Sequence, residues 1–72
     1  MTGVARYLLR GFFVAPDVKY SGSVETTVDR AVPPNESEAT TLLAPLAGQD
    51  VTRWHGEDYQ TWFTSVSIEE QP

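Results

Sequence analysis

The stretch that decides the fold lies near the start of the chain and reads VARYLLRGFFV, residues 4–14. It is the most apolar segment of the protein. Read as a strand, it places apolar side chains on both faces from Phe12 onward, which indicates a central strand or a bulge at Gly11. A helix is the competing interpretation, because several apolar residues also follow helical spacing. Gly11 would cost a helix interior about 1 kcal/mol, and the aromatic and β-branched run after it favours a strand.

After this strand comes a second segment in which apolar and polar residues alternate, and two prolines then end it. Pro16 and Asp17 end the first strand, and residues 18–28 again alternate apolar and polar side chains. The Ser-Gly-Ser sequence at residues 21–23 predicts either a hairpin turn or a bulge in one longer strand. Two prolines, at residues 33–34, then end regular structure.

A helix is predicted near residues 36–47. Asn35 can cap it through the side-chain oxygen, with Glu38 in the position of a capping box. Pro45 should end or kink the helix, since it lacks an N–H. Gly48 then suits the position that follows a helix end. The expected core contacts are Leu42, Leu43 and Leu46.

The last third predicts two further strands, at residues 51–55 and 59–68, with a turn at residues 56–58 between them. In the second of these, alternation puts four residues on one face: Trp62, Thr64, Val66 and Ile68. Residues 69–72 are expected to form a frayed tail. The fold class is therefore α+β in one domain, residues 1–72: a small antiparallel sheet of three to five strands with one short helix packed on one face. A small β-barrel with an inserted helix is the alternative.

Composition restricts the chemistry. The 72 residues include no cysteine and one histidine, so disulfides and thiolate metal sites are excluded. The net charge is −5, with residues 1–20 at +2 and residues 31–72 at −6. Such a field would repel a nucleic acid. No uninterrupted apolar stretch suits a signal peptide or a membrane span, and we expect a cytoplasmic protein.

No catalytic group is evident in the sequence. His55 has acidic neighbours at Asp50, Glu57 and Asp58, but their spacing fits no ligand pattern and is typical of a solvated turn. The serines lack a nucleophile motif, and the glycines are scattered singly, so no phosphate loop is predicted. We therefore expect no enzymatic activity, no cofactor and no metal.

The aromatic residues suggest a binding surface. Phe12, Phe13 and Trp62 are assigned to the core, but the chain carries more large rings than a small sheet can hide. Exposed Trp and Tyr side chains are typical of binding hot spots. The predicted protein-binding residues are the aromatic anchors Trp54, Tyr59 and Phe63 and the acidic rim residues Glu57 and Asp58.

Function is predicted in several classes. The leading prediction is a non-enzymatic protein-binding module, an inhibitor or accessory subunit of a bacterial or phage system, with a basic partner. One alternative is an inhibitor whose carboxylates mimic nucleic acid. Another is a structural homo-oligomer that self-associates through a sheet edge or through the N-terminal apolar strand. A minimal enzyme or metal-binding domain centred on His55 is the remaining class.

Overall fold

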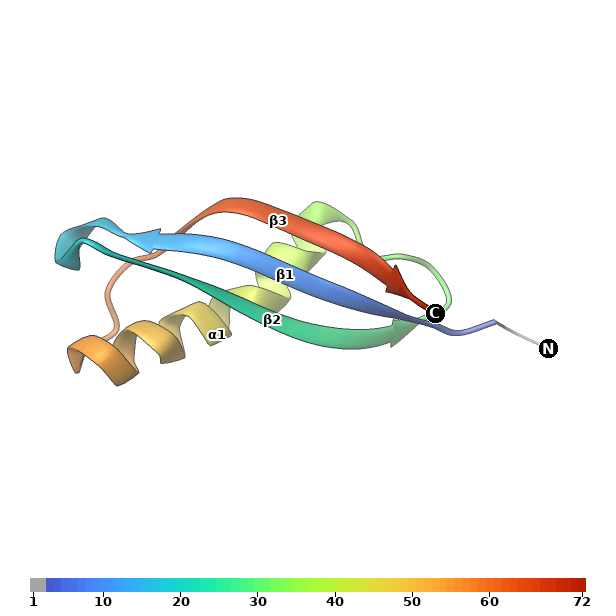
Figure 1. Cartoon of the computed structure of the whole chain (residues 1–72), viewed down its shortest axis with the longest axis horizontal. Helices are drawn as coiled ribbons and strands as arrows, with labels where there is room; N and C mark the ends of the chain where they lie inside the picture. The colour runs from blue at the N-terminus through green and yellow to red at the C-terminus, as the bar shows by residue number, and fades with distance from the viewer. Residues whose placement is uncertain (1–2) are drawn as a thin grey trace.

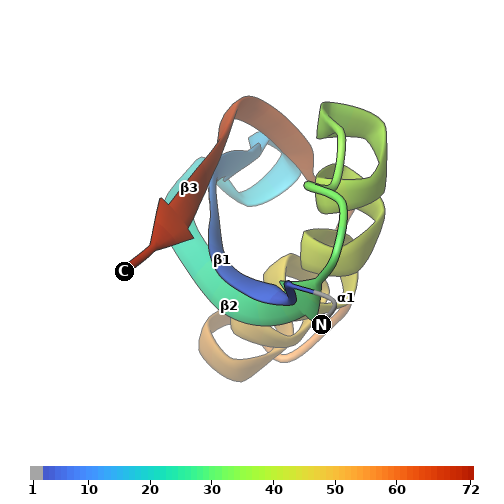
Figure 2. The same cartoon turned by 90° about the vertical axis from the view of Figure 1, so that its right-hand side faces the viewer.

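The structure, a computed structural model, describes residues 3–72 as a three-stranded antiparallel sheet with one helix on one face (Figures 1 and 2). The elements are β1 (Ala5–Ala15), a 3-10 turn (Pro16–Val18), β2 (Tyr20–Arg30), α1 (Glu36–His55) and β3 (Trp62–Gln71). The strand order is β2-β1-β3, so β2 and β3 are the two edges. The α+β prediction is confirmed. The sheet stays open, and the barrel alternative is wrong.

β1 is the central strand, as its two apolar faces predicted. On the helix side, Tyr7, Leu9, Phe13 and Ala15 are almost completely buried. The helix covers only this side of the sheet. The apolar residues on the other side of β1 therefore have no layer above them in the part of the chain that the structure describes.

The β1–β2 hairpin turns earlier than the sequence predicted. Lys19 adopts a left-handed conformation with φ 54°, and its N–H donates to the carbonyl of Pro16 at 3.2 Å. β2 then pairs with β1 without interruption from Tyr20 to Arg30. Residues 21–23 are therefore neither a turn nor a bulge. Pro16 supplies the fixed φ of a tight turn, which makes the Ser-Gly-Ser sequence unnecessary for chain reversal.

The start of α1 is confirmed, but its length is not. The side chain of Asn35 accepts a hydrogen bond from the N–H of Glu38 at 2.7 Å, as an N-cap should. The helix then continues through Pro45 for a total of 20 residues. Gly48 lies inside it, and residues 51–55, predicted as a strand, form its last turns. The helix ends at Gly56, where φ is 79°.

A buried stripe explains why the helix continues past its proline. Ala39, Leu43, Ala47 and Val51 recur every fourth residue, and none has any exposed surface. Burying a side chain such as leucine or valine stabilises the fold by about 1.5–3 kcal/mol. Ending at Pro45 would forfeit the contacts of Ala47 and Val51. Burial at these positions therefore offsets the cost of about 3 kcal/mol that a proline imposes on a helix interior.

β3 contains a bulge that the sequence did not reveal. Phe13 pairs with Phe63 and Phe12 pairs with Ser65, which leaves Thr64 as the extra residue. Phe63 therefore joins the helix-facing residues Val66 and Ile68, while Trp62 points to the opposite side of the sheet. The predicted face that grouped Trp62 with Val66 and Ile68 is wrong. β3 also extends to Gln71, so most of the tail expected at residues 69–72 is paired with β1.

Candidate functional site

The side of the sheet that α1 does not cover, here called the open face, is divided into a charged half and an apolar half. The charged half contains two cross-strand ion pairs. Arg6 Nε lies 3.0 Å from Asp29 Oδ1, and Arg10 Nε lies 3.1 Å from Glu25 Oε2. Hydrogen bonding to Arg6 lowers the pKa of Asp29. All four side chains are largely exposed, and such pairs add little stability. Their main effect is to pair four of the charges on this half of the face.

The apolar half lies at the hairpin end and consists of Phe12, Val14 and Trp62, here called the open-face patch. Val14 and Trp62 are cross-strand partners, and Phe12 is the neighbouring open-face residue on β1. Phe12 is 50% exposed and Trp62 is 55% exposed. Assigning these two rings to the core was wrong, because the helix covers only one face and the bulge turns Trp62 away from it. Phe13, the third ring so assigned, is buried.

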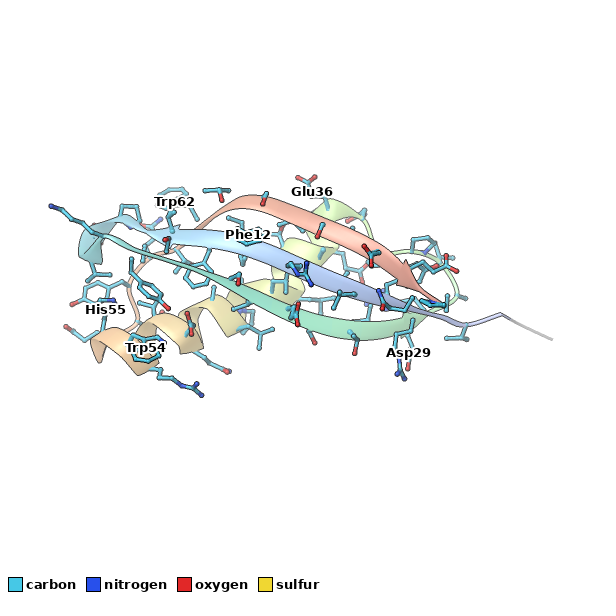
Figure 3. All side chains as sticks on the ribbon, viewed as in Figure 1. Phe12, Asp29, Glu36, Trp54, His55 and Trp62 are labelled. Carbon is cyan, nitrogen blue, oxygen red and sulfur yellow. The ribbon has the colours of Figure 1, made fainter. Side chains whose placement is uncertain are left out.

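The predicted binding residues are located at the end of α1, in the loop that follows and at the start of β3. Trp54 is 66% exposed in the last turn of α1 (Figure 3). Glu57 and Asp58 are exposed in the loop. Tyr59 is half-buried, and its hydroxyl donates to Glu57 at 3.0 Å, which raises the pKa of Tyr59. Of the two tyrosine and tryptophan anchors proposed, only Trp54 is largely free to contact a partner.

Phe63 has a structural role. Its ring packs edge-on against Phe13, with the ring centroids 6.2 Å apart. A Cβ atom built on Gly11 would lie only 2.6 Å from Phe63 Cε1, so the absence of a side chain on Gly11 makes room for this ring. Phe63 therefore belongs to the core that holds α1 on the sheet. Its ring is poorly placed to anchor a partner.

The surroundings of His55 fit the interpretation of a surface histidine. Its exposed ring packs edge-on against Tyr20, with the centroids 5.0 Å apart. The Tyr20 hydroxyl donates to Asp50 Oδ2 at 2.6 Å, and this bond raises the pKa of Tyr20. Within residues 3–72, no three His, Asp or Glu side chains gather in an arrangement that could hold a metal ion. The geometry supports a packing role for His55, against the ring of Tyr20.

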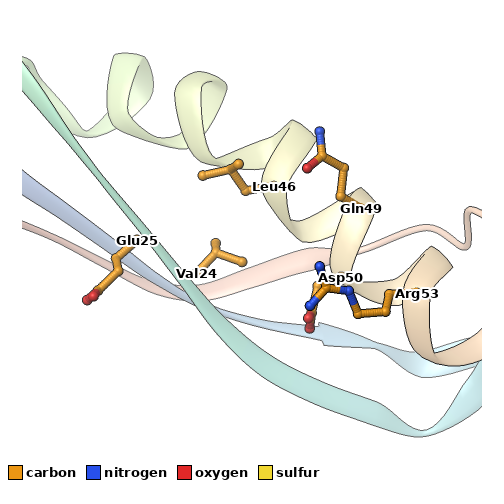
Figure 4. A pocket seen from close by; sticks show the side chains of 6 residues that line it. All are labelled: Val24, Glu25, Leu46, Gln49, Asp50 and Arg53. Carbon is orange, nitrogen blue, oxygen red and sulfur yellow. The ribbon is translucent and has the colours of Figure 1, made fainter.

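A shallow depression lies between the outer edge of β2 and the flank of α1 (Figure 4). Its lining residues are Val24, Glu25, Leu46, Gln49, Asp50 and Arg53, and its volume is about 190 Å³. Pockets that enclose drug-sized ligands usually measure about 300–1,000 Å³. The depression is therefore better suited to a few side chains of another polypeptide than to a small molecule.

Comparisons with models of protein families, with curated proteins and with solved structures gave no match. Across residues 3–72, no helix combines the length and the apolar character needed to cross a membrane.

Proposed function

We propose that this chain is a non-enzymatic protein-binding module that docks through the open-face patch. The observation that carries the proposal is the exposure of Phe12 and Trp62 side by side with Val14, on a sheet face that no element within residues 3–72 covers. Aromatic side chains are enriched among the residues that dominate binding energy. Their rings are rigid, so little conformational entropy is lost when a partner covers them.

The charge distribution supports a basic partner. Three of the five basic residues form ion pairs with acids, namely Arg6, Arg10 and Arg30. Within residues 3–72, two basic residues and seven acids are not in such pairs, and together these residues carry the net charge of −5. Glu69 and Glu70 lie near the end of β3, and Glu57 and Asp58 lie in the loop that precedes it. A basic surface would be attracted during approach, and association should weaken as salt is added.

The experiment is to isolate partners on the tagged protein and then to measure the affinity of the purified partner for single variants. Phe12→Ser and Trp62→Ser should each weaken binding by about 30-fold or more, the loss expected for a hot spot. Val32→Ser is the matched control, because Val32 is 72% exposed and lies outside the patch. Circular dichroism checks that each variant keeps its fold.

Three results would each contradict part of the proposal. Unchanged affinity in both patch variants would show that the open-face patch is not the docking surface. If Trp54→Ala alone abolished binding, the predicted site at the end of α1, with Glu57 and Asp58 at its rim, would be the docking surface. A partner whose affinity did not fall with salt would exclude the role proposed for the acidic residues.

A further inference from the structure

The two edges of the sheet differ in their protection against pairing with another strand. Natural proteins protect edge strands with bulges, charges or prolines. β3 has such features: a bulge at Thr64, the carboxylates of Glu69 and Glu70, and Pro72 directly after its last residue. An incoming strand would meet an irregular, negatively charged edge. β3 is therefore poorly suited to pairing.

β2 lacks the bulge and the proline that protect β3. It is a regular strand of 11 residues without proline, lysine or bulge, and it pairs with β1 along its whole length. Its two acids, Glu25 and Asp29, each form an exposed ion pair with an arginine of β1, which leaves them charged. Alternate residues of an edge strand point their N–H and C=O groups away from the sheet. Apart from the hydrogen bonds within α1 and between paired strands, no backbone hydrogen bond among residues 3–72 involves a residue of β2.

We propose that β2 pairs with β2 of a second copy of this chain, antiparallel and around a two-fold axis at Thr26, to form a continuous six-stranded sheet. The sequence of β2 supports a second copy as the occupant. In a continuous sheet, side chains that lie opposite each other on neighbouring strands point to the same face. Helix-side residues of one copy must therefore lie opposite helix-side residues of the other, because a shift by one residue would move every side chain to the wrong face. This requirement limits the registers to those centred on one residue of the strand.

Charge then selects among the registers. An axis at Glu25 would place this carboxylate opposite its own copy, and an axis at Thr27 would place Glu25 opposite Asp29. Like charges directly opposite each other are destabilising. With the axis at Thr26, Glu25 lies opposite Thr27 of the second copy, and Asp29 lies opposite Ser23. Both acids then face hydroxyl groups.

The helix side favours the same register. The axis at Thr26 places Thr26 opposite its own copy and Val24 opposite Val28, which gives three neighbouring pairs of β-branched residues. Such cross-strand pairs stabilise sheets. An axis at Val24 also keeps the acids apart, but it pairs Thr26 with Gly22, which has no side chain to contribute. Of these two registers, the Thr26 axis therefore gives the better match on the helix side.

The path of α1 brings its C-terminal half next to the edge of the sheet that the second copy would use. The helix crosses the sheet diagonally, starting beside β3 and ending beside β2 (Figures 1 and 2). With the axis at Thr26, Val28 of the second copy would lie opposite Val24, which lines the depression together with Leu46 (Figure 4). The incoming side chains would fill this depression. Each copy would keep its open-face patch free, so the dimer would present two docking surfaces.

The test is sedimentation of the purified chain alone. At about 100 µM, well above the Kd of a micromolar interface, the mass should be twice the 8.0 kDa of one chain. Thr27→Glu places two new carboxylates opposite Glu25 and should raise the dissociation constant about tenfold. Thr27→Lys places an ammonium group there and should leave the dimer intact. Ser67→Glu adds the same charge to the open face of β3 and is the matched control.

Each outcome decides the proposal. A mass of 8.0 kDa at every concentration would overturn it. A dimer that Thr27→Glu does not weaken, or that only Ser67→Glu weakens, would exclude pairing through β2 in this register. Hydrogen exchange provides a second measurement, since dimerisation should slow exchange at alternate amides of β2 and leave those of β3 unchanged. Failure to dimerise would not affect the proposed docking function, because the open-face patch does not include β2.

Discussion

Gly11 offers a direct test of how the core is packed. A Cβ atom at this position would lie 2.6 Å and 2.8 Å from two carbons of the Phe63 ring and 3.1 Å from Leu43 Cδ1. The backbone of Gly11 is not in a left-handed conformation, so the whole cost of Gly11→Ala should come from overpacking. Overpacking in a core typically costs about 1–3 kcal/mol. For a domain of this size, a loss of about 2 kcal/mol lowers the Tm by roughly 8–16 °C.

The assay is thermal unfolding followed by far-ultraviolet circular dichroism, because both tryptophans are exposed and report poorly on the core. The matched background is Phe63→Leu, which removes the ring that the new methyl group would meet. Gly11→Ala should cost little in that background, giving a coupling of at least about 1 kcal/mol between the two positions. An unchanged Tm for Gly11→Ala, or an equal loss in both backgrounds, would show that Phe63 does not pack over Gly11.

Two further predictions concern α1 and the pH dependence of stability. Pro45 is exposed in the helix interior, where proline is about 3 kcal/mol less favourable than alanine. Removing the proline also gives the unfolded chain more conformational freedom, which reduces the gain, so Pro45→Ala should raise the Tm by roughly 10 °C. A lower Tm would mean that the proline ring makes stabilising contacts. The hydrogen bond to Asp50 raises the pKa of Tyr20 above 10.0, so its contribution to stability is complete below pH 10 and is lost as the pH rises through the folded-state pKa. Tyr20→Phe should therefore flatten the decline of the urea midpoint above pH 10, whereas an unchanged profile would exclude this role.

The parts of the fold that depend on local sequence could be predicted. The start of α1 depends on Asn35 and its bond to Glu38, which lie three residues apart. The central position of β1 follows from its two apolar faces, a property of one segment. In both cases the residues that decide the structure are close together in the chain. Short-range patterns are therefore sufficient to recognise them.

The end of α1 shows where this reasoning fails. Pro45 and Gly48 are local signals for the end of a helix, and in the local sequence they outweigh the apolar residues beyond them. Ala47 and Val51 lie next to Phe13 and Ala15 in the folded core, and these contacts join segments more than 30 residues apart. The spacing of Ala39, Leu43, Ala47 and Val51 was the signal that could have revealed the longer helix.

The location of the open-face patch depends on a contact of still longer range. Strict alternation along β3 from Val66 back to Trp62 would turn Trp62 towards the helix and expose Phe63. The bulge at Thr64 reverses this assignment, and the Thr64 hydroxyl donates to the carbonyl of Phe12 at 3.2 Å across 52 residues of sequence. Gly11 leaves space for the Phe63 ring at that point, and Trp62 is turned outward beside Phe12. One unpaired residue therefore decides which aromatic ring completes the core and which is left for a partner.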